Sequence, residues 1–452
     1  MTKTELKSVS AIAAVYGLRM LGLAMVMPIF MLMSTHLKGY TESLAGLAIG
    51  AYGLSQALLQ IPYGMLSDRF GRKPLIIIGL ILFGLGSLLA AFSDSIYGVI
   101  AGRFLQGSGA IASVLMALVS DVTSEESRTK AMATIGIGVG VAFSISLVIG
   151  PLLGQLWGLE GIFGLTAAFA GVGLLVVIFV VPTPPKLVVH ADTEAVAGRI
   201  AAVLKNRRLL RLDYGVMTLH MVLVAFFVSV PTILQDNLHI PKVHHSWVYL
   251  SVVAPAFFAM IPFIIIGEKR RKMKQVLGGS VALMAVSMAL LAVWHQSLAA
   301  VWFFIFLYFM AFNLLEASLP SLVSKECRAG SKGTAMGLYS TSQFIGAFLG
   351  GAIAGIVLQH FGVVPVLVLM VVLLLIWLVI IIGMPQPSYS TSFVLKLASL
   401  DSINIGEVSQ SLAAVRGVED VMIVPAEQAA YLKVDKKALD EESLKQLPFV
   451  AG

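Results

Sequence analysis

The chain has 452 residues, of which 58% are hydrophobic and 12% are charged. A soluble domain carries about twice that share of charged residues, so most of this chain must lie in lipid. The net charge of +7 would suit a nucleic-acid-binding protein, but the lysines and arginines are scattered over many loops and form no single basic face. The single cysteine, Cys327, excludes an internal disulfide and cannot build a zinc site alone.

Twelve apolar runs are long enough to cross a bilayer, which needs ~20 apolar residues. The first continues past the length of a signal segment and lacks a small-residue cleavage site, so we keep it as a span. We predict an all-α membrane protein with twelve transmembrane helices. The runs lie near 10–34, 43–66, 74–93, 96–120, 129–157, 161–182, 211–235, 244–267, 274–293, 298–324, 332–360 and 363–384.

The distribution of basic residues predicts the orientation. Of the 31 lysines and arginines, 27 fall in segments assigned to one side of the membrane. The loops on the other side hold Lys38 and Lys242, and Arg19 and Arg103 lie inside spans. Basic residues concentrate on the cytosolic side of membrane proteins. Both termini are therefore expected in the cytosol.

An internal repeat predicts the domain organisation. Segments 117–132 and 321–336 share Leu-Val-Ser, a serine and Ala-Met at one constant offset, and each follows the fourth span of a group of six. Two parallel halves of six helices would enclose a central cavity. We expect halves at 1–182 and 211–384, a linker at 183–210 and a cytosolic tail domain at 391–449. Asp192 can cap a short amphipathic linker helix on the inner leaflet; a loosely ordered tether is the alternative.

A charged turn separates the second and third runs and reads Gly-Met-Leu-Ser-Asp-Arg-Phe-Gly-Arg-Lys. Its glycines suit crowded positions or positive φ, its aspartate can cap a helix, and its bases keep it cytosolic. A plain basic loop would explain the bases but not the Gly–Asp–Gly spacing. The residues singled out are Gly64, Asp68, Arg69, Gly71, Arg72 and Lys73.

This decapeptide resembles the loop signature between helices 2 and 3 of the major facilitator superfamily. The resemblance implies two six-helix halves that rock against each other to transport a small molecule. It also implies that Asp68 and Arg72 form a charge cluster with Asp121, which ends the fourth span. In the family this cluster locks the outward-facing state, so we expect separation of the halves at the cytosolic side to break it.

Ionisable residues within spans are costly and usually functional. Arg103 lies in Gly-Arg-Phe-Leu-Gln-Gly-Ser-Gly-Ala, which is similar to the arginine motif of proton-coupled members. It would bias a nearby carboxylate or substrate; the alternative is a structural arginine bonded to carbonyls of the first span. Gln106, in the same stretch, is a cavity candidate. Arg19 would line the cavity or extend to the inner surface.

Glu316 is the only acidic residue that we place well inside a span, one turn after the cavity candidate Asn313. Burial favours the protonated form of a carboxyl group, which suits a group that takes and releases a proton. The alternative is a structural glutamate near the cytosolic end of the span. His220 is a second proton-coupling candidate, although a lone histidine in an apolar helix is more often simply hydrogen-bonded.

The fifth span carries Gly138, Gly140, Gly150, Pro151 and Gly154. Glycines at this spacing permit close helix approach, and proline kinks a helix. The Gly-Pro-x-x-Gly arrangement resembles the antiporter motif of exporters in the superfamily. Span eleven has glycines on what we take as the equivalent face but no proline; they are Gly346, Gly350, Gly351 and Gly355.

The tail has the composition of a soluble domain, with a β-α-β-β-α pattern over 392–397, 403–415, 418–424, 430–434 and 439–447. This order fits a small α+β ferredoxin-like fold. It resembles the heavy-metal-associated domain, but 398–402 lacks that family's Cys-x-x-Cys, so we expect no metal. The tail should dock on the basic turns 267–274 and 325–332. The acids available for this are Glu419, Asp420, Asp440, Glu441 and Glu442.

These features predict a proton-coupled secondary transporter, not an enzyme, that exports small amphipathic compounds. The resemblance implies a monomer in the bacterial inner membrane. No nucleotide motif is present, so an ion gradient is the expected energy source, and no cofactor is expected. A nutrient importer driven by proton symport and a non-transporting sensor with the tail as output are the alternatives.

Overall fold

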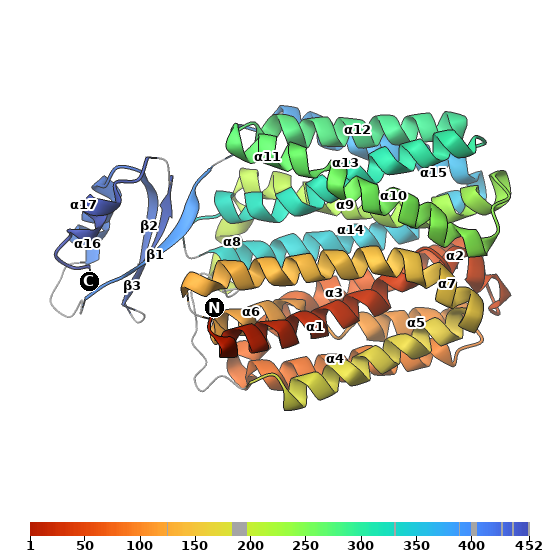
Figure 1. Cartoon of the computed structure of the whole chain (residues 1–452), viewed down its shortest axis with the longest axis horizontal. Helices are drawn as coiled ribbons and strands as arrows, with labels where there is room; N and C mark the ends of the chain where they lie inside the picture. Colours follow the sequence, from red (N-terminus) through yellow and green to blue (C-terminus); the bar gives the residue numbers. More distant parts are fainter. Residues whose placement is uncertain are drawn as a thin grey trace.

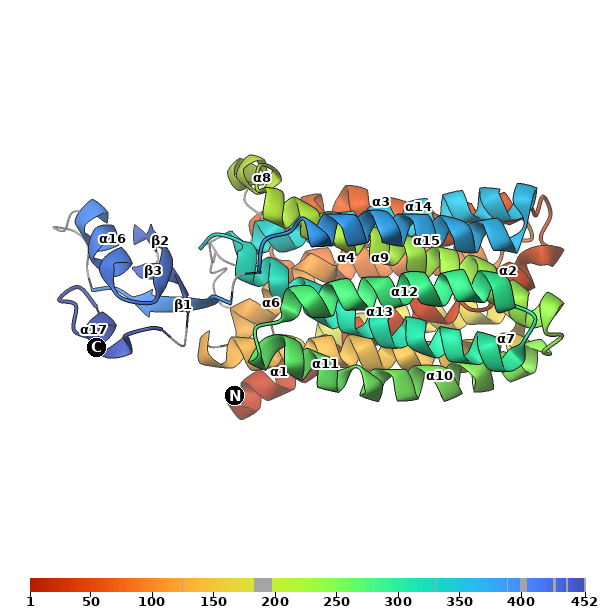
Figure 2. The same ribbon diagram turned by 90° about the horizontal axis from the view of Figure 1, so that it is seen from above.

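The computed structural model describes residues 1–123, 125–182, 197–329, 331–387, 389–398, 405–425, 428–435 and 438–450. A long body of roughly parallel helices has a small sheet-containing tail at one end, and the N-terminus lies at that same end (Figures 1 and 2). We call this the tail end of the helical body and the opposite end the far end. The predicted cap Asp192 and residues 399–402 of the predicted metal-free loop fall outside the described residues.

The N-terminal half begins with α1, whose first turn is closed by hydrogen bonds between Thr2 and Glu5. This capping box lets the helix begin before the first apolar run. The half contains α1 (Lys3–Met25), α2 (Phe30–Met33), η1 (Ser34–His36), α3 (Glu42–Phe70), α4 (Arg72–Ala91), α5 (Ile96–Gly107), α6 (Ala112–Val122) and α7 (Glu125–Phe179).

The C-terminal half follows the same plan. It contains α9 (Arg207–Thr232), η2 (Ile233–Asn237), η3 (Lys242–His244), α10 (His245–Ala259), α11 (Ile261–Lys269), α12 (Met273–Trp294), α13 (Leu298–Glu326), α14 (Lys332–Phe361) and α15 (Val363–Ile382). The short helix α8 (Ala197–Leu204) precedes this half and lies within the predicted linker.

Eleven helical stretches of the described chain are long and apolar enough to cross a membrane. One of them, at 130–179, contains Gly158 at φ 69° and ψ −174°, a backbone conformation that favours glycine. At this bend α7 reverses direction (Figure 1). It therefore holds both predicted runs, 129–157 and 161–182. The fold is that predicted, while the exact number of crossings stays a prediction.

Backbone-to-backbone contact joins the two halves near the far end. A Cβ atom on Gly46 of α3 would lie 2.3 Å from the carbonyl oxygen of Gly351 on α14. The amide of Ser43 donates to Gln359 Oε1 at 3.1 Å, and Lys242 Nζ donates to the carbonyl of Leu32 at 2.8 Å. Only residues without side chains allow helices to approach this closely. The structure is thus closed between the halves at the far end.

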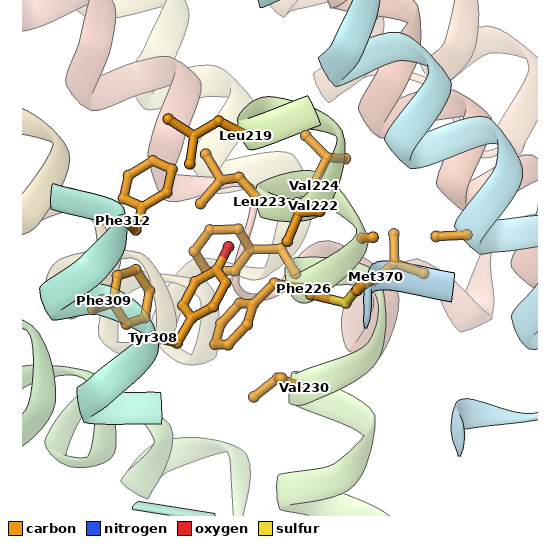
Figure 3. Packing of buried hydrophobic residues seen from close by; sticks show 14 of the residues in the cluster. Leu219, Val222, Leu223, Val224, Phe226, Val230, Tyr308, Phe309, Phe312 and Met370 are labelled. Atoms are coloured by element: carbon orange, nitrogen blue, oxygen red, sulfur yellow. The ribbon is translucent and has the colours of Figure 1, made fainter. Parts of the chain in front are cut away.

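An aromatic core holds α9 against α13 within the C-terminal half (Figure 3). Phe226 stacks on Tyr308, with ring centroids 4.6 Å apart, and meets Phe309 edge-on at 5.2 Å. Phe312, one turn further along α13, lies 6.3 Å from the ring of His220. Aromatic pairs of this kind add to the stability that burial provides. This packing brings α9 and α13 together where their polar residues lie.

The tail folds as predicted, with strands β1 (Thr391–Lys396), β2 (Val418–Val424) and β3 (Ala429–Val434) and helices α16 (Ile405–Ala414) and α17 (Glu441–Lys445). The sheet order is β1-β3-β2, and both pairings are antiparallel. Val408, Leu412 and Leu444 from the helices pack on one face of the sheet. The ferredoxin-like prediction is confirmed.

The other face of the sheet docks on the C-terminal half, where Ala329 packs against Ala429 and Tyr431. Asp420 accepts a hydrogen bond from the amide of Ala329 at 2.9 Å, and Asp435 pairs with Arg271 at 2.7 Å. Docking on both basic turns is therefore confirmed, with Asp435 as an unforeseen partner.

The expected contact of Asp440 is wrong, because this carboxylate caps α17 by accepting from the Ser443 amide. Hydrogen bonds from Ser443 hold the pKa of Asp440 below its usual value. A residue engaged in capping its own helix is not available to the transmembrane half.

The glycine contact generates a first prediction. Gly46→Ala should open the far end, since overpacking costs ~1–3 kcal/mol and about 1.4 kcal/mol changes a population tenfold. Labelling of a cysteine placed at Ser43, in a Cys327→Ser background, should accelerate about tenfold. Gly164→Ala is the matched control, because a Cβ there meets nothing within 4 Å. Equal labelling rates in the two variants would contradict the prediction.

Candidate functional site

The predicted charge cluster is present at the turn between α3 and α4. Arg72 is 3% exposed, and its Nε donates to Asp121 Oδ2 at 3.0 Å. Its guanidinium also pairs with Asp68 and donates to Ser67 Oγ at 2.7 Å. Gly71 has φ 95°, which meets the expected need for positive φ. The turn thus holds one arginine between two carboxylates.

Two expectations for this turn are wrong. Asp68 caps no helix N-terminus, because it lies in the last turn of α3 and the residue preceding α4 is Gly71. Gly64 is neither crowded nor at positive φ, since a Cβ there would lie 3.6 Å from Ser113 Oγ.

The remaining bases of the turn have separate roles. Lys73 Nζ donates to the carbonyls of Ile178 and Val181 at 2.9 and 3.0 Å, which ties the turn to the end of α7. Arg69 is exposed and lies over the Phe70 ring, 5.5 Å from its centroid.

The cluster lies within one half of the protein. Asp68, Arg72 and Asp121 belong to α3, α4 and α6, all N-terminal. Their mutual contacts therefore do not themselves join the halves, and separating the halves need not break them. The expectation that the Asp68–Arg72–Asp121 contacts must break on opening is corrected accordingly. A role of the cluster in switching stays a prediction.

Arg103 is held by neutral groups. It is 1% exposed and donates to Gln106 Oε1 at 2.8 Å and to the carbonyls of Ala48 and Ile49 at 3.3 and 3.4 Å. These carbonyls belong to α3 rather than to the first span. Gln106 is itself buried and donates to Ser87 Oγ at 2.8 Å. The observed partners favour a structural role for both residues, and Gln106 does not line an open cavity.

Arg19 is also anchored inside the N-terminal half. It is 6% exposed and donates to the Tyr52 hydroxyl at 2.9 Å and the Gly109 carbonyl at 2.8 Å. It therefore does not extend to the inner surface. Tyr16, one turn earlier, interacts electrostatically with both Arg19 and Glu316.

The proton-coupling candidates Glu316 and His220 lie together. Glu316 Oε2 is 3.7 Å from His220 Nε2, and the Gln343 amide nitrogen is 2.7 Å from the same ring nitrogen. His220 Nδ1 lies 3.2 Å from the Val216 carbonyl, to which it can donate. With the proton on Nδ1, Nε2 accepts from Gln343; a second proton places a positive charge beside Glu316. The amide nitrogen of Asn313 is buried without a hydrogen-bond partner among the described residues.

Sequence reasoning missed Asp213 and Tyr339. Asp213 is 5% exposed on α9, and Tyr339 is 3% exposed on α14. Asp213 lies near the start of the predicted run 211–235. Its spacing of seven residues from His220, two turns along one helix face, was the available signal.

The glycines of the exporter-like motif differ in their contacts. A Cβ on Gly150 would lie 2.4 Å from the Met25 carbonyl oxygen, and one on Gly154 would lie 2.9 Å from Ile29. Helix α7 therefore packs closely on the far half of the first span and on α2. By contrast, a Cβ on Gly138 or Gly140 would meet nothing within 4 Å. The close-packing interpretation holds for the first pair and is wrong for the second.

The glycines of span eleven face two partners rather than one. Gly346 and Gly350 on α14 contact the carbonyls of Met217 and Met221 on α9, whereas Gly351 and Gly355 contact α3. The expectation of a face equivalent to that of span five holds for Gly346 and Gly350, which contact the first helix of their half as Gly150 contacts α1, and is wrong for Gly351 and Gly355.

The charge cluster generates a second prediction. Arg72→Met removes the cation between Asp68 and Asp121, so unfolding free energy should fall by ~3–5 kcal/mol, as on breaking a buried ion pair. Arg69→Met, an exposed arginine in the same turn, should change it by less than ~0.5 kcal/mol. Thermal unfolding of the detergent-purified variants measures both. Equal melting temperatures would show that the cluster does not stabilise the turn.

Comparison with known proteins agrees with this geometry. The Major Facilitator Superfamily model matches residues 12–351. Inner membrane transport protein YajR of Escherichia coli (strain K12) is 42% identical over 449 residues, 99% of this chain and 98% of that protein. Tetracycline resistance protein, class H, of Pasteurella multocida is 34% identical over 158 residues, 34% of this chain and 38% of that protein.

A solved structure shows the same fold. It is a bacterial homologue of the human lysosomal transporter Spinster, in an inward-facing and occupied conformation. It matches with a TM-score of 0.70 at 14% identity, over 85% of this chain and 97% of its own. The superfamily model, the relative that spans nearly the whole chain and the fold of two helical halves all support one conclusion. The chain belongs to the major facilitator superfamily of membrane transporters.

Proposed function

We propose that this transporter is proton-coupled and exports small amphipathic compounds by alternating access. The observation that carries the proposal is the Glu316–His220 pair, with 3.7 Å between carboxylate oxygen and ring nitrogen, inside the helical body. A protonated pair carries one more positive charge than a deprotonated pair, so the electrostatics facing the other half change with each proton.

Export is favoured over uptake by two observations. Gly150 and Gly154 bring α7 against α1 and α2 around Pro151, in the arrangement that resembles the exporter motif. A relative of the chain bears the name of a tetracycline resistance protein. The protein would act as a monomer in the bacterial inner membrane, with both termini in the cytosol, and would need no cofactor.

Proteoliposomes with an imposed pH gradient test the proposal, with tetracycline as the probe. An exporter accumulates the probe against an opposed proton flux, and an importer moves both in one direction. Absence of gradient-driven movement for tetracycline and a panel of amphipathic cations would leave the sensor as the better interpretation. The docking of the tail on Ala329 and Arg271 is the observation that favours that second candidate.

Proton coupling generates a third prediction. Glu316→Gln keeps the side-chain shape but cannot ionise, so gradient-driven tetracycline transport should fall by about 100-fold or more while probe binding persists. Transport assays and equilibrium binding on one preparation measure the two effects. Glu442→Gln, on an exposed tail residue, should match the wild type. Unchanged gradient dependence in Glu316→Gln would move the role to another group.

The turn generates a fourth prediction. Asp68→Asn removes one charge from the Arg72 cluster and should bias the alternating-access equilibrium by ~1–3 kcal/mol, a typical coupling energy. Transport should fall strongly while the amount of inserted protein stays unchanged. Initial rates and membrane yields, compared with those of Arg69→Gln, measure this. Wild-type rates in Asp68→Asn would remove the switching role of the turn.

A further inference from the structure

We propose that Asp213 is a second proton-binding carboxyl group of the C-terminal half, linked through the Tyr339 hydroxyl to the Glu316–His220 pair. Protons would then leave this pair toward the tail end of the helical body. The inference rests on the proposed proton coupling and names residues that would serve it. It assigns a role to the two buried polar residues that the sequence did not single out.

Asp213 is a buried acid without an evident counter-charge. It lies in the second turn of α9, is 5% exposed, and neither carboxylate oxygen has a hydrogen-bond partner among the described residues. An ionised carboxylate in such surroundings is costly, whereas the neutral acid is not. The site therefore favours the carboxyl group together with its proton.

The charged groups nearest to Asp213 along the chain have other partners. Arg208, on the same helix, pairs with Glu326 of α13 at 3.3 Å. Arg211 donates to the Gly383 carbonyl, after α15, at 2.9 Å. The α15 residue next to this turn is Trp377, which meets Gly215 and does not titrate. Among the titratable groups on the helices packed beside α9, α13 carries Glu316, Tyr308 and Lys325 and α14 carries Tyr339 and Lys332, while Tyr214 and His220 lie on α9 itself.

Tyr339 lies on α14, the helix that packs against α9. Gly346 and Gly350 hold α14 against α9. On α14, Gln343 contacts His220, and Tyr339 lies one turn nearer the tail end. The Tyr339 hydroxyl is buried without a hydrogen-bond partner among the described residues, and it interacts electrostatically with Glu316 and with Asp213.

The transfer conserves protons and electrons. Asp213 first releases its proton to the solution at the tail end. The Glu316 O–H bond then breaks and its proton passes to the Tyr339 oxygen, while the Tyr339 O–H proton passes to the Asp213 carboxylate. Glu316 is left as a carboxylate, Asp213 is again the neutral acid, and Tyr339 is unchanged. Neither the Asp213 nor the Tyr339 oxygens have a direct hydrogen-bond partner among the described residues, so a bridging water or a side-chain rotation completes each step.

An infrared titration of the full-length protein in lipid, with no substrate added, tests the protonation of Asp213. The carbonyl-stretching band of protonated carboxyl groups is followed from about pH 5 to about pH 9, a range in which ordinary acids are ionised. At neutral pH the wild type should show a component that Asp213→Asn lacks. The matched control is Asp236→Asn, on the exposed turn that follows α9, which should keep this component.

A transport assay tests the path. Tyr339→Phe should keep the Asp213 infrared component but slow gradient-driven tetracycline transport about tenfold or more. Asp213→Asn should slow transport similarly, and Asp213→Glu should restore part of it. Asn is nearly isosteric with Asp, so melting temperatures close to that of the wild type are expected and show that the variants fold.

The outcomes separate this inference from the proposed function. If the infrared spectrum of Asp213→Asn matches that of the wild type, Asp213 does not hold the proposed proton. This conclusion stands even when transport by the wild type is driven by a pH gradient. Normal gradient-driven transport in Asp213→Asn and Tyr339→Phe overturns the path alone. If the wild type transports tetracycline at a rate that does not depend on the pH gradient, the proposed coupling and the path are both overturned, whatever the infrared spectrum shows.

Discussion

An ionised side chain inside the helical body must find partners, and this requirement explains most of the polar architecture. Arg103 and Arg19 meet it with neutral carbonyl, amide and hydroxyl oxygens, and both are almost fully buried. Arg72 meets it with two carboxylates. These contacts let the arginines hold helices together, although Arg19 Nε has no partner among the described residues. Among the described residues, the acidic groups with buried oxygens that lack a hydrogen-bond partner are Glu316 and Asp213, and both lie in the C-terminal half.

The buried polar residues of the two halves therefore have different roles. In the N-terminal half the arginines tie α1, α4 and α5 to α3 and to the residues beside them. In the C-terminal half α9, α13 and α14 hold Asp213, His220, Glu316 and Tyr339 near one another, next to the aromatic core of Figure 3. Close glycine contacts at the far end bring the two halves together. A proton that changes the charge on the C-terminal side of the interface would alter the balance between closed and open arrangements.

The tail contacts the C-terminal half at places that the repeat relates to the charged turn of the first half. Lys325 pairs with Glu268 at 2.7 Å, and Asp121, its counterpart in the repeat, pairs with Arg72, so the signs are reversed. Arg271 of the same turn finds its carboxylate in Asp435 of the tail. The ring of Tyr389 makes cation–π contacts with both Arg271 and Lys325. The tail thus completes an ionic cluster that the N-terminal half builds from its own residues.

The amino-acid sequence by itself determined the fold class, the two halves, the charged turn and the ferredoxin-like tail. These depend on apolar run length, repeat spacing and strand alternation, which are local properties of the chain. Only the tertiary structure decided that Arg103 binds carbonyls of α3, that Gly138 and Gly140 face no helix, and that Asp435 rather than Asp440 meets the basic turn. It also decided that Asp213 and Tyr339 are buried in the C-terminal half. Those facts depend on which residues from distant helices come into contact, and a single chain's periodicity gives a helix its buried face but not the partner that covers it.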